Sequence, residues 1–585
     1  MKKLLVYLKD YKKESILGPF FKLLEASFEL LVPLVMAAVI DTGIANRDSG
    51  YVIRMCLIMV GLGIVGLASS VTAQYFAAKA AVGFATGVRR ALFSHIQGLS
   101  YTEMDTLGTS TMITRMTSDV NQAQSGVNMT LRLFLRSPFI VFGAMFMAFT
   151  INAKAAMVFV VTIPLLSVVV FGIMLATIPL YRKVQAGLDK VLGTTRENLT
   201  GVRVLRAFNK EEEERARFSE RNESLTKMQI FAGRISALMN PITYVIINGA
   251  VVVLIWTGAI QVDNGVITQG EVVALVNYMS QILVELIKLA NLIITITKAL
   301  ACANRISAVL DTGSSMESPR LEEWLRAGKK KEAGSERGTV EFDHASLTYK
   351  NAGAESLTDI HFRAERGQTI GIIGGTGSGK SSLVNLIPRF YDVSGGEVLV
   401  DGVDVREYPI EVLRSKIGVV PQKAVLFRGS IRDNLRWGKK DATDSEMWEA
   451  LELSQAKEFV EKKEDGLDVL IAQGGKNLSG GQRQRLTIAR ALVKKPEILI
   501  LDDSASALDF ATDAKLRGAI RAMKERLTVF IVSQRASSIQ YADQIVVLDD
   551  GEVAGIGTHS SLLESCPVYQ EIYYSQFPKE DRQNG

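Results

Sequence analysis

The chain has 585 residues, of which 48% are hydrophobic and 22% charged, with a formal net charge of +5. That length exceeds what one hydrophobic core usually serves, so at least two domains are expected. The small positive charge is spread along the chain without a compact basic region, which argues against a nucleic-acid partner. Cys56, Cys302 and Cys566 have no paired spacing, which argues against a disulfide framework or a CxxC metal site.

The first residues, MKKLLVYLKDYKKES, combine a short apolar run with several lysines. The run is too short for the core of a secretory signal peptide, and no small-residue cleavage site follows it. Its alternation of apolar and basic residues predicts instead a short helix that lies in the membrane interface.

Residues 1–311 form a predicted membrane domain. Crossing about 30 Å of hydrocarbon takes roughly 20 helical residues, and six apolar stretches approach or exceed that length. The alternative, buried helices of a large soluble protein, is disfavoured by so many long runs with few charges. The predicted spans cover residues 16–40, 55–78, 133–151, 155–180, 239–260 and 272–297.

The links between these spans alternate in length. The links at 79–132 and 181–238 are long and hold many Lys and Arg, whereas the other three are short. The positive-inside rule therefore places both termini and both long links in the cytosol. We expect the long links to be helical extensions whose tips, near 101–107 and 200–206, reach a cytosolic domain.

Charges inside the spans are the local indications of cargo. Glu25 and Glu29 share one helix face, and a carboxylate at that depth usually faces a wet cavity. They either contact cargo or pair with Lys22 or a neighbouring helix. Glu285 and Lys288 leave the same choice open, because i, i+3 spacing lets them neutralise each other.

Residues 312–337 are polar and lack a sustained apolar period, which predicts a linker. From residue 338 to residue 585, short β runs alternate with helical segments, as in an α/β domain. The predicted architecture is a six-span α-helical membrane domain followed by an α/β domain.

The strongest motif in the chain opens the α/β region. The segment GGTGSGKS at 374–381 fits G-x-x-x-x-G-K-[ST], follows an apolar strand and begins a helix. Its glycines let backbone N–H groups close around phosphates, while Lys380 reaches the β and γ oxygens and Ser381 offers a hydroxyl to Mg²⁺. A glycine-rich turn without a ligand is the alternative. The residues predicted to hold ATP here are Gly374, Gly375, Thr376, Gly377, Ser378, Gly379, Lys380, Ser381 and Ser382.

Two further motifs complete a P-loop NTPase domain. An apolar strand at 498–501 ends in Asp502, the expected second ligand of Mg²⁺, and the next residue, Asp503, is placed to position the attacking water. Between the motifs, Leu478-Ser-Gly-Gly-Gln leads into a helix, whose free N–H groups suit an anion. Taken alone, this segment is equally well explained as a helix N-cap formed by Ser479.

In this order and spacing, the motifs resemble the ABC exporter superfamily over nearly the whole chain. Six spans before an ATPase domain look like its half-transporter arrangement, and residues 200–213 look like its second intracellular loop. The resemblance implies that Tyr349 stacks on adenine, that Gln422 is the Q-loop residue at the metal, and that 506–509 is the D-loop. It also implies that the ABC signature, which contacts nucleotide, comprises Ser479, Gly480, Gly481 and Gln482.

In that family, two ATPase domains meet head to tail, and each ATP lies between one Walker A loop and the signature of the other chain. One copy of each motif in this chain therefore implies a dimer. ATP binding would close the domains and turn the cavity outward, and hydrolysis would reopen it.

Two catalytic positions depart from the family pattern. Asp503 stands where the family carries Glu, and Gln534 stands where it carries the switch His. Asp is one methylene shorter, roughly 1.5 Å less reach, and a misplacement of that order costs about 10²-fold in rate. Gln534 forms hydrogen bonds but carries no titratable charge. Gln473, just before the signature, stands where related chains often have Glu, and it gives weak additional support to a departure from the family's catalytic pattern.

Together these departures resemble the degenerate-site subunit of heterodimeric ABC exporters. We therefore expect ATP-driven export of an amphipathic drug-, lipid- or peptide-like compound across the cytoplasmic membrane, with a homologous half-transporter as partner. A slow homodimeric exporter and a non-transporting, nucleotide-sensing regulator are the alternatives. The fused domain order disfavours an importer.

Overall fold

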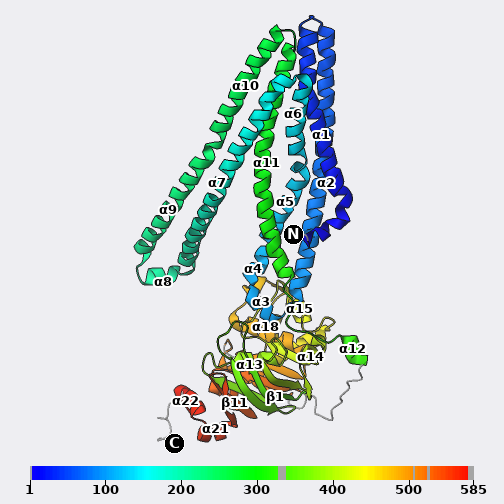
Figure 1. Cartoon of the computed structure of the whole chain (residues 1–585). Coiled ribbons are helices and arrows are strands. Elements are labelled where there is room, and N and C mark those ends of the chain that lie inside the picture. The colour runs from blue at the N-terminus through cyan, green and yellow to red at the C-terminus, as the bar shows by residue number, and fades with distance from the viewer. Residues whose placement is uncertain (1–2, 327–337, 505–506, 524–526, 578–585) are drawn as a thin grey trace. The chain divides into compact units, whose positions relative to one another are not determined.

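The computed structural model describes residues 3–326, 338–504, 507–523 and 527–577 (Figure 1). Contacts divide the chain into a helical unit, Met1–Gln97 with Thr109–Thr312, and an α/β unit, Gly98–Gly108 with Gly313–Gly585. The short helix α3, Tyr101–Leu107, thus groups with the α/β unit, although it lies between membrane-domain segments in the sequence.

Within the described residues, six helical stretches are long and apolar enough to cross a membrane, and each contains one predicted span. They are Leu4–Ile44, Ser49–Gln97, Thr109–Ile151, Ala153–Thr200, Glu211–Asp263 and Gln269–Leu310. The 49 residues of Ser49–Gln97 make a helix roughly 70 Å long at about 1.5 Å per residue. The helices therefore extend well beyond the hydrocarbon layer, as the long links predict.

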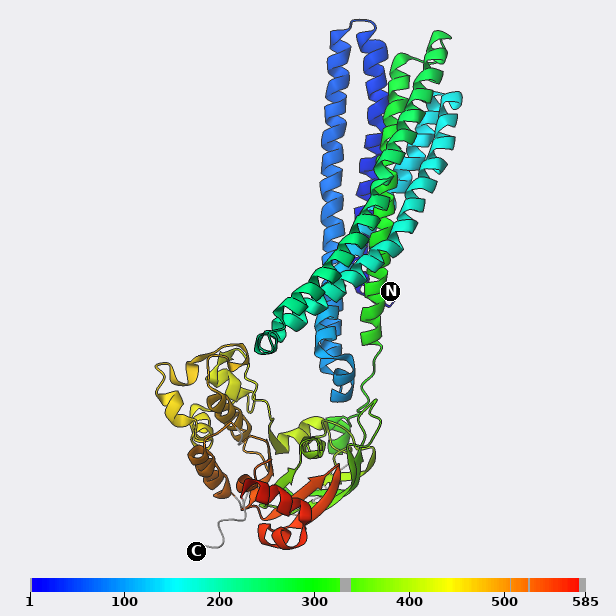
Figure 2. The same cartoon turned by 90° about the vertical axis from the view of Figure 1, so that its left-hand side faces the viewer.

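The main helices of this unit follow the chain in order. They are α1 (Lys12–Ala38), α2 (Ser49–Gln97), α4 (Thr109–Thr114), α5 (Val120–Leu133), α6 (Arg136–Ile151), α7 (Ala153–Thr200), α8 (Val202–Ala207), α9 (Glu211–Ala237), α10 (Met239–Asp263) and α11 (Gln269–Leu310). Figures 1 and 2 show α7 running beside α9 and α10, with α8 joining α7 to α9 at one end. No residue of α8 is buried, and its position matches the second predicted tip.

Small residues bring the membrane helices close together. Ala26 of α1, Ala144 of α6 and Ala156 of α7 are fully buried in one cluster with residues of α10 and α11. Close backbone approach through small side chains is how helices pack where lipid removes the hydrophobic driving force. The N-terminal segment Leu4–Tyr11 also packs tightly, since a Cβ on Gly83 of α2 would lie 2.1 Å from the Tyr11 ring.

The α/β unit contains a six-stranded sheet in the order β12-β11-β3-β10-β9-β6 and a four-stranded antiparallel sheet in the order β2-β1-β4-β5. Strands β11, β3, β10, β9 and β6 are parallel, and β12 is antiparallel. The strands are β1 (Val340–Leu347), β2 (Leu357–Ala364), β3 (Thr369–Gly374), β4 (Gly395–Val400), β5 (Val403–Asp404), β6 (Ile417–Val420), β7 (Gly429–Ser430), β8 (Leu470–Ile471), β9 (Ile498–Asp502), β10 (Thr528–Val532), β11 (Gln544–Asp549) and β12 (Glu552–Gly557).

The remaining helices of this unit follow in chain order. They are α12 (Leu321–Arg326), α13 (Lys380–Leu386), α14 (Ile410–Lys416), α15 (Ile431–Arg436), α16 (Asp444–Leu453), α17 (Lys457–Glu461), α18 (Gly480–Leu492), α19 (Phe510–Arg521), α20 (Ala536–Ile539), α21 (His559–Ser565) and α22 (Pro567–Gln576). Helices α13, α14, α18, α20 and α22 pack on the six-stranded sheet, whereas α15 and α16 pack on α18. The predicted fold class, six membrane helices followed by an α/β ATPase domain, is confirmed. Because the carboxyl ends of parallel strands meet at one edge, ligand-binding loops gather there.

Candidate nucleotide-binding site

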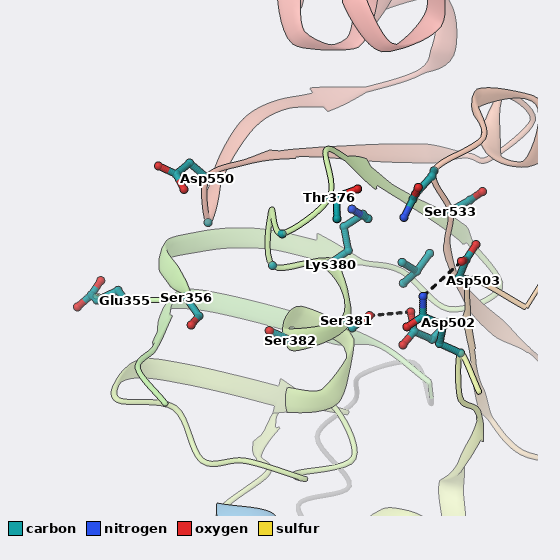
Figure 3. A pocket seen from close by; sticks show the side chains of 16 residues that line it. Glu355, Ser356, Thr376, Lys380, Ser381, Ser382, Asp502, Asp503, Ser533 and Asp550 are labelled. Atoms are coloured by element: carbon teal, nitrogen blue, oxygen red, sulfur yellow. Dashed lines mark hydrogen bonds between the residues drawn. The ribbon is translucent and has the colours of Figure 1, made fainter. Parts of the chain in front are cut away.

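A cavity of about 400 Å³ lies where β3, β9 and β10 end (Figure 3). The structure gathers here most of the side chains that the motifs predict, although they come from segments far apart in the chain. The predicted residues that line it are Thr376, Gly377, Gly379, Lys380, Ser381, Ser382, Gln422, Asp502, Asp503 and Gln534.

Three glycines of the loop, Gly374, Gly377 and Gly379, are required by its geometry. A Cβ on Gly374 would lie 2.2 Å from the Leu548 carbonyl oxygen, and one on Gly379 would lie 2.9 Å from that of Ser356. Gly377 and Gly379 also have φ values of 89° and 91°, in the region that favours glycine. The loop between β3 and α13 is therefore nearly bare backbone, as a phosphate cradle requires.

Lys380 lies folded over this loop. Its ammonium donates to the carbonyl oxygens of Gly374 at 2.9 Å and Gly375 at 2.5 Å. Burial lowers the pKa of Lys380, against the attraction of the Asp503 and Asp502 carboxylates. A partly buried cation beside a glycine-rich turn suits a polyanion.

Ser381 and Asp502 form the oxygen-rich corner of the cavity. The Ser381 hydroxyl donates to Oδ1 of Asp502 at 3.0 Å (Figure 3). Burial raises the pKa of Asp502, and the Asp503 carboxylate adds to the rise, while the bond from Ser381 and the charge of Lys380 oppose it. A hydroxyl, two carboxylates and the nearby Gln422 amide are the hard oxygen donors that Mg²⁺ prefers, so these residues fit that metal.

The two positions that depart from the family pattern, Asp503 and Gln534, line the same cavity. Asp503 has a φ of 45°, and its backbone N–H donates to the carbonyl oxygen of Val532 at 3.0 Å. Its Oδ2 lies 3.5 Å from the amide nitrogen of Gln422. Gln534 lines the cavity directly after Ser533, at the end of β10. The positions predicted to bind phosphate and to activate water thus share one cavity.

One residue that the sequence analysis did not single out fixes the backbone around Gln534. Gln576, at the end of α22, donates to the carbonyl oxygen of Gln534 at 2.8 Å and accepts from the backbone N–H of Ala536 at 2.9 Å. Other lining residues that motif analysis missed include Glu355, Ser356, Ser533, Asp550 and Gly551. The Asp-Gly pair between β11 and β12 signals only a turn in the sequence, so its place beside the cavity had no local signal.

Tyr349 lies beside the cavity but is not part of its lining. Its hydroxyl donates to Oγ of Ser382 at 2.9 Å, and its ring meets the ring of Tyr391 edge-on at 5.0 Å. Burial raises the pKa of the Tyr349 hydroxyl. Tyr391 in turn donates to Asp105 of α3 at 2.6 Å, so α3 connects to the phosphate loop through two tyrosines.

The signature segment lies outside this cavity. Ser479 caps α18, because its hydroxyl accepts from the backbone N–H of Gln482 at 3.3 Å and the Gln482 side chain accepts from the N–H of Ser479 at 3.0 Å. Ser479 and Gly480 are exposed, and a Cβ on Gly480 would meet nothing within 4 Å. The first N–H groups of a helix lack intrahelical partners, so this end can serve a ligand brought by another chain. Of the predicted D-loop, Ser506 lies outside the described residues.

The charges inside the membrane spans are paired. Glu25 binds the Lys22 ammonium at 2.5 Å, and Glu29 binds the Arg136 guanidinium at 2.6 Å. Glu285 binds Arg136 at 2.6 Å and Lys288 at 2.8 Å. Both predicted kinds of pairing, within a helix and with a neighbouring helix, therefore occur.

Comparisons with known proteins agree with this geometry. Residues 15–286 match the ABC transporter transmembrane region, and residues 357–506 match the ABC transporter ATPase family. An uncharacterised ABC transporter ATP-binding protein of Mycobacterium tuberculosis is 38% identical over 573 residues, 97% of each chain. YfiB of Bacillus subtilis, also an uncharacterised ABC transporter ATP-binding protein, is 36% identical over 581 residues, 99% of each chain.

A more distant relative has a named activity. The ATP-dependent lipid A-core flippase of Yersinia pestis is 27% identical over 572 residues, 97% of this chain and 96% of the flippase. Among solved structures, a bacterial Atm1-family ABC exporter with ATP bound superposes with a TM-score of 0.78, covering 97% of this chain and 98% of that one at 22% identity. That similarity extends over both parts of the fold.

Proposed function

This chain belongs to the ABC transporter family, and on that premise we propose that it is one half of a heterodimeric exporter of amphipathic compounds. Members of this family are multi-pass membrane proteins that couple ATP hydrolysis to transport, and their exporters act as dimers in the bilayer. The finer points of the proposal are the unlike partner, the weakened ATPase site of this chain, and the cytoplasmic membrane as its location.

The observation that carries the proposal is that Asp503 and Gln534 both line the cavity that contains a complete phosphate loop. The loop is suited to bind ATP through residues 374–380, with Mg²⁺ at Ser381, Gln422 and Asp502 and with Tyr349 near the base. Asp503 reaches less far than Glu by one methylene, and Gln534 supplies no titratable group. The site of this chain is therefore built to hold ATP and to hydrolyse it slowly.

The signature supports an unlike partner. Ser479, Gly480 and Gly481 retain the full motif, and Gly480 faces open space. We infer that this end of α18 completes the active site of a partner that has Glu and His at the two catalytic positions. The similarity to a lipid A-core flippase favours a cargo with an apolar part.

The test begins with the composition of the purified transporter. The chain is isolated with an affinity tag from membranes of its own cell, and native mass spectrometry gives the subunit masses. A one-to-one complex with a homologous chain is expected, and a complex of two copies of this chain would overturn the heterodimer.

Transport is then measured in proteoliposomes with a fluorescent short-chain phospholipid and a cationic dye as probes. ATP-dependent movement of either probe is expected of an exporter. ATP binding without movement of any member of a chemically varied panel would instead support the nucleotide-sensing regulator.

A further inference from the structure

A second cavity, of about 550 Å³, lies among α1, α2 and α11 in the membrane unit. Its walls differ in character. Side chains of α1 and α2 supply an apolar wall, while α11 supplies most of the polar groups. The apolar wall includes Val32, Pro33, Met36 and Met59, and the polar wall consists of Glu29, Asn277, Ser280, Gln281, Glu285 and Lys288.

Four alternating charges run along the polar wall. Glu29 binds Arg136 at 2.6 Å, Arg136 binds Glu285 at 2.6 Å, and Glu285 binds Lys288 at 2.8 Å. Oε2 of Glu285 also accepts from the Ser137 hydroxyl at 2.8 Å. Glu25 also approaches Arg136, at 4.0 Å, from outside the cavity. Within the cavity lining, the chain of charges begins with the Glu29 carboxylate and ends with the Lys288 ammonium.

The inner and outer members of this chain differ in exposure. The side chains of Arg136 and Glu285 are 7% and 3% exposed, so they neutralise each other inside the protein. Those of Glu29 and Lys288 are 40% and 42% exposed, and both line the cavity. An ammonium offers three donors and a carboxylate about four acceptor sites, so each end can form further bonds. The cavity therefore presents one negative and one positive group.

Glu25 differs from Glu29 although both lie on one face of α1. Its carboxylate binds Lys22 at 2.5 Å, its side chain is 17% exposed, and it does not line the cavity. Lys22 also donates to the Ser70 hydroxyl at 3.1 Å. Of the two carboxylates that the sequence places on one helix face, Glu29 alone lines this cavity, and Lys288 lines it as well.

We propose that this cavity binds amphiphiles whose head group carries both a positive and a negative charge. The cationic part would meet Glu29, the anionic part would meet Lys288, and the apolar part would follow Val32, Met36 and Met59. The inference rests on the proposed export function and deepens it by naming the class of cargo.

Physical reasons favour a head group with both charges over either charge alone. Charges at this depth are costly unless paired, and their attraction strengthens as water is excluded. A singly charged head group would satisfy one end of the charge chain and leave the other end with less solvent than before. Gln281 adds an acceptor, because its Oε1 is buried and has no hydrogen-bond partner among the described residues.

Three ligands with the same octyl tail test the proposal: octylphosphocholine, octyltrimethylammonium and octyl phosphate. Their binding to the purified full-length transporter, held in an uncharged maltoside detergent without ATP, is measured by isothermal titration calorimetry. We expect the zwitterion to bind at least about tenfold more tightly than either ligand whose head group carries charge of one sign only, the effect of one added charge-assisted contact. Equal affinities for all three would overturn the proposal.

Two variants assign the ends of the head group. Glu29→Gln should weaken binding of the zwitterion and the cation about tenfold and leave octyl phosphate unchanged. Lys288→Gln should weaken binding of the zwitterion and octyl phosphate about tenfold and leave the cation unchanged. Glu25→Gln is the matched control, since it removes a carboxylate one helical turn away that lies outside the cavity, and it should leave all three affinities unchanged. Equal weakening of all three ligands by Glu29→Gln would show that the charge chain serves only the fold.

The experiment separates this proposal from the proposed function. Binding without ATP reports on the cavity alone, whereas proteoliposome transport reports on export. Preferential zwitterion binding without ATP-driven movement would refute the exporter and keep the site. Movement of a probe with no preference among the octyl ligands would keep the exporter and refute the site.

Discussion

The phosphate loop of the nucleotide cavity has the residues of the ABC exporter pattern, whereas positions 503 and 534 depart from that pattern. In the phosphate loop, Gly374 and Gly379 have neighbouring backbone atoms where a side chain would begin, so the fold and the ligand impose the same residues. In the same cavity, Asp503 and Gln534 replace Glu and His, yet the backbone of Asp503 remains bonded to Val532 at 3.0 Å. Binding ATP and hydrolysing it are therefore separable demands, and under the proposed function only the second is relaxed in this chain.

The largest expected effect comes from blocking the signature. In Gly480→Val, the new side chain would enter open space and cover the first N–H groups of α18 without disturbing the fold. Losing a preorganised donor to developing charge typically costs on the order of 10²-fold in rate. ATP turnover of the purified transporter should fall by about that factor.

Asp503→Asn is the paired measurement. It removes the remaining carboxylate at the proposed water-activating position of this chain. Turnover should change by less than about twofold, since the proposed function has that position already impaired. If Asp503→Asn proves more damaging than Gly480→Val, this chain runs its own hydrolysis and the comparison drawn above is wrong.

Lys380→Ala addresses the phosphate loop, which has the family pattern. Replacing a charged hydrogen-bond donor removes about 1.5–3 kcal/mol, so affinity for ATP at this chain's own site should fall by about thirtyfold. Photolabelling with azido-ATP measures this, because the two subunits separate on a gel. Unchanged labelling of this chain would refute the phosphate-loop assignment.

The local patterns of the sequence predicted most of this site. The strand, loop and helix around Lys380 are contiguous in the chain, and six apolar runs sufficed to predict six spans because length and hydropathy decide membrane insertion. Pairings between distant segments had no such signal. Nothing near Gln534 indicates that Gln576 would hold its carbonyl oxygen, and nothing near Glu29 indicates Arg136 as its partner.

The grouping of α3 is a similar case. The sequence predicted a helical tip at 101–107 and contact with a cytosolic domain, and Tyr101 does pack on Phe390 with ring centroids 4.8 Å apart. The surface on which Tyr101 packs is formed by segments almost 300 residues further along the chain. The sequence around Tyr101 therefore could not indicate which aromatic side chains it contacts.

Restoring the two altered positions should return hydrolysis to this chain. In a transporter silenced by Gly480→Val, the pair Asp503→Glu and Gln534→His is expected to recover turnover about tenfold, because a positioned general base contributes at least that much. The control is Gln534→His alone, which keeps Asp503 and so lacks the longer carboxylate. Turnover that stays at the silenced level would show that features other than these two side chains limit the site.

The smallest expected effect concerns the metal. Ser381→Ala removes the hydroxyl that now donates to Asp502 at 3.0 Å, but water readily replaces one ligand of an octahedral Mg²⁺. Azido-ATP labelling of this chain should therefore weaken only about fivefold with Mg²⁺ present and stay unchanged in chelator. Ser382→Ala is the matched control, since that hydroxyl contacts Tyr349 instead.

The raised pKa of Asp502 adds a pH dependence, because a proton competes with Mg²⁺ for this carboxylate at a higher pH than for an ordinary Asp. The Mg²⁺ enhancement in the unmodified chain should accordingly decline on acidification at a higher pH than an ordinary Asp would require. A Mg²⁺ enhancement that Ser381→Ala and Ser382→Ala reduce equally would move the metal away from the Ser381–Asp502 corner.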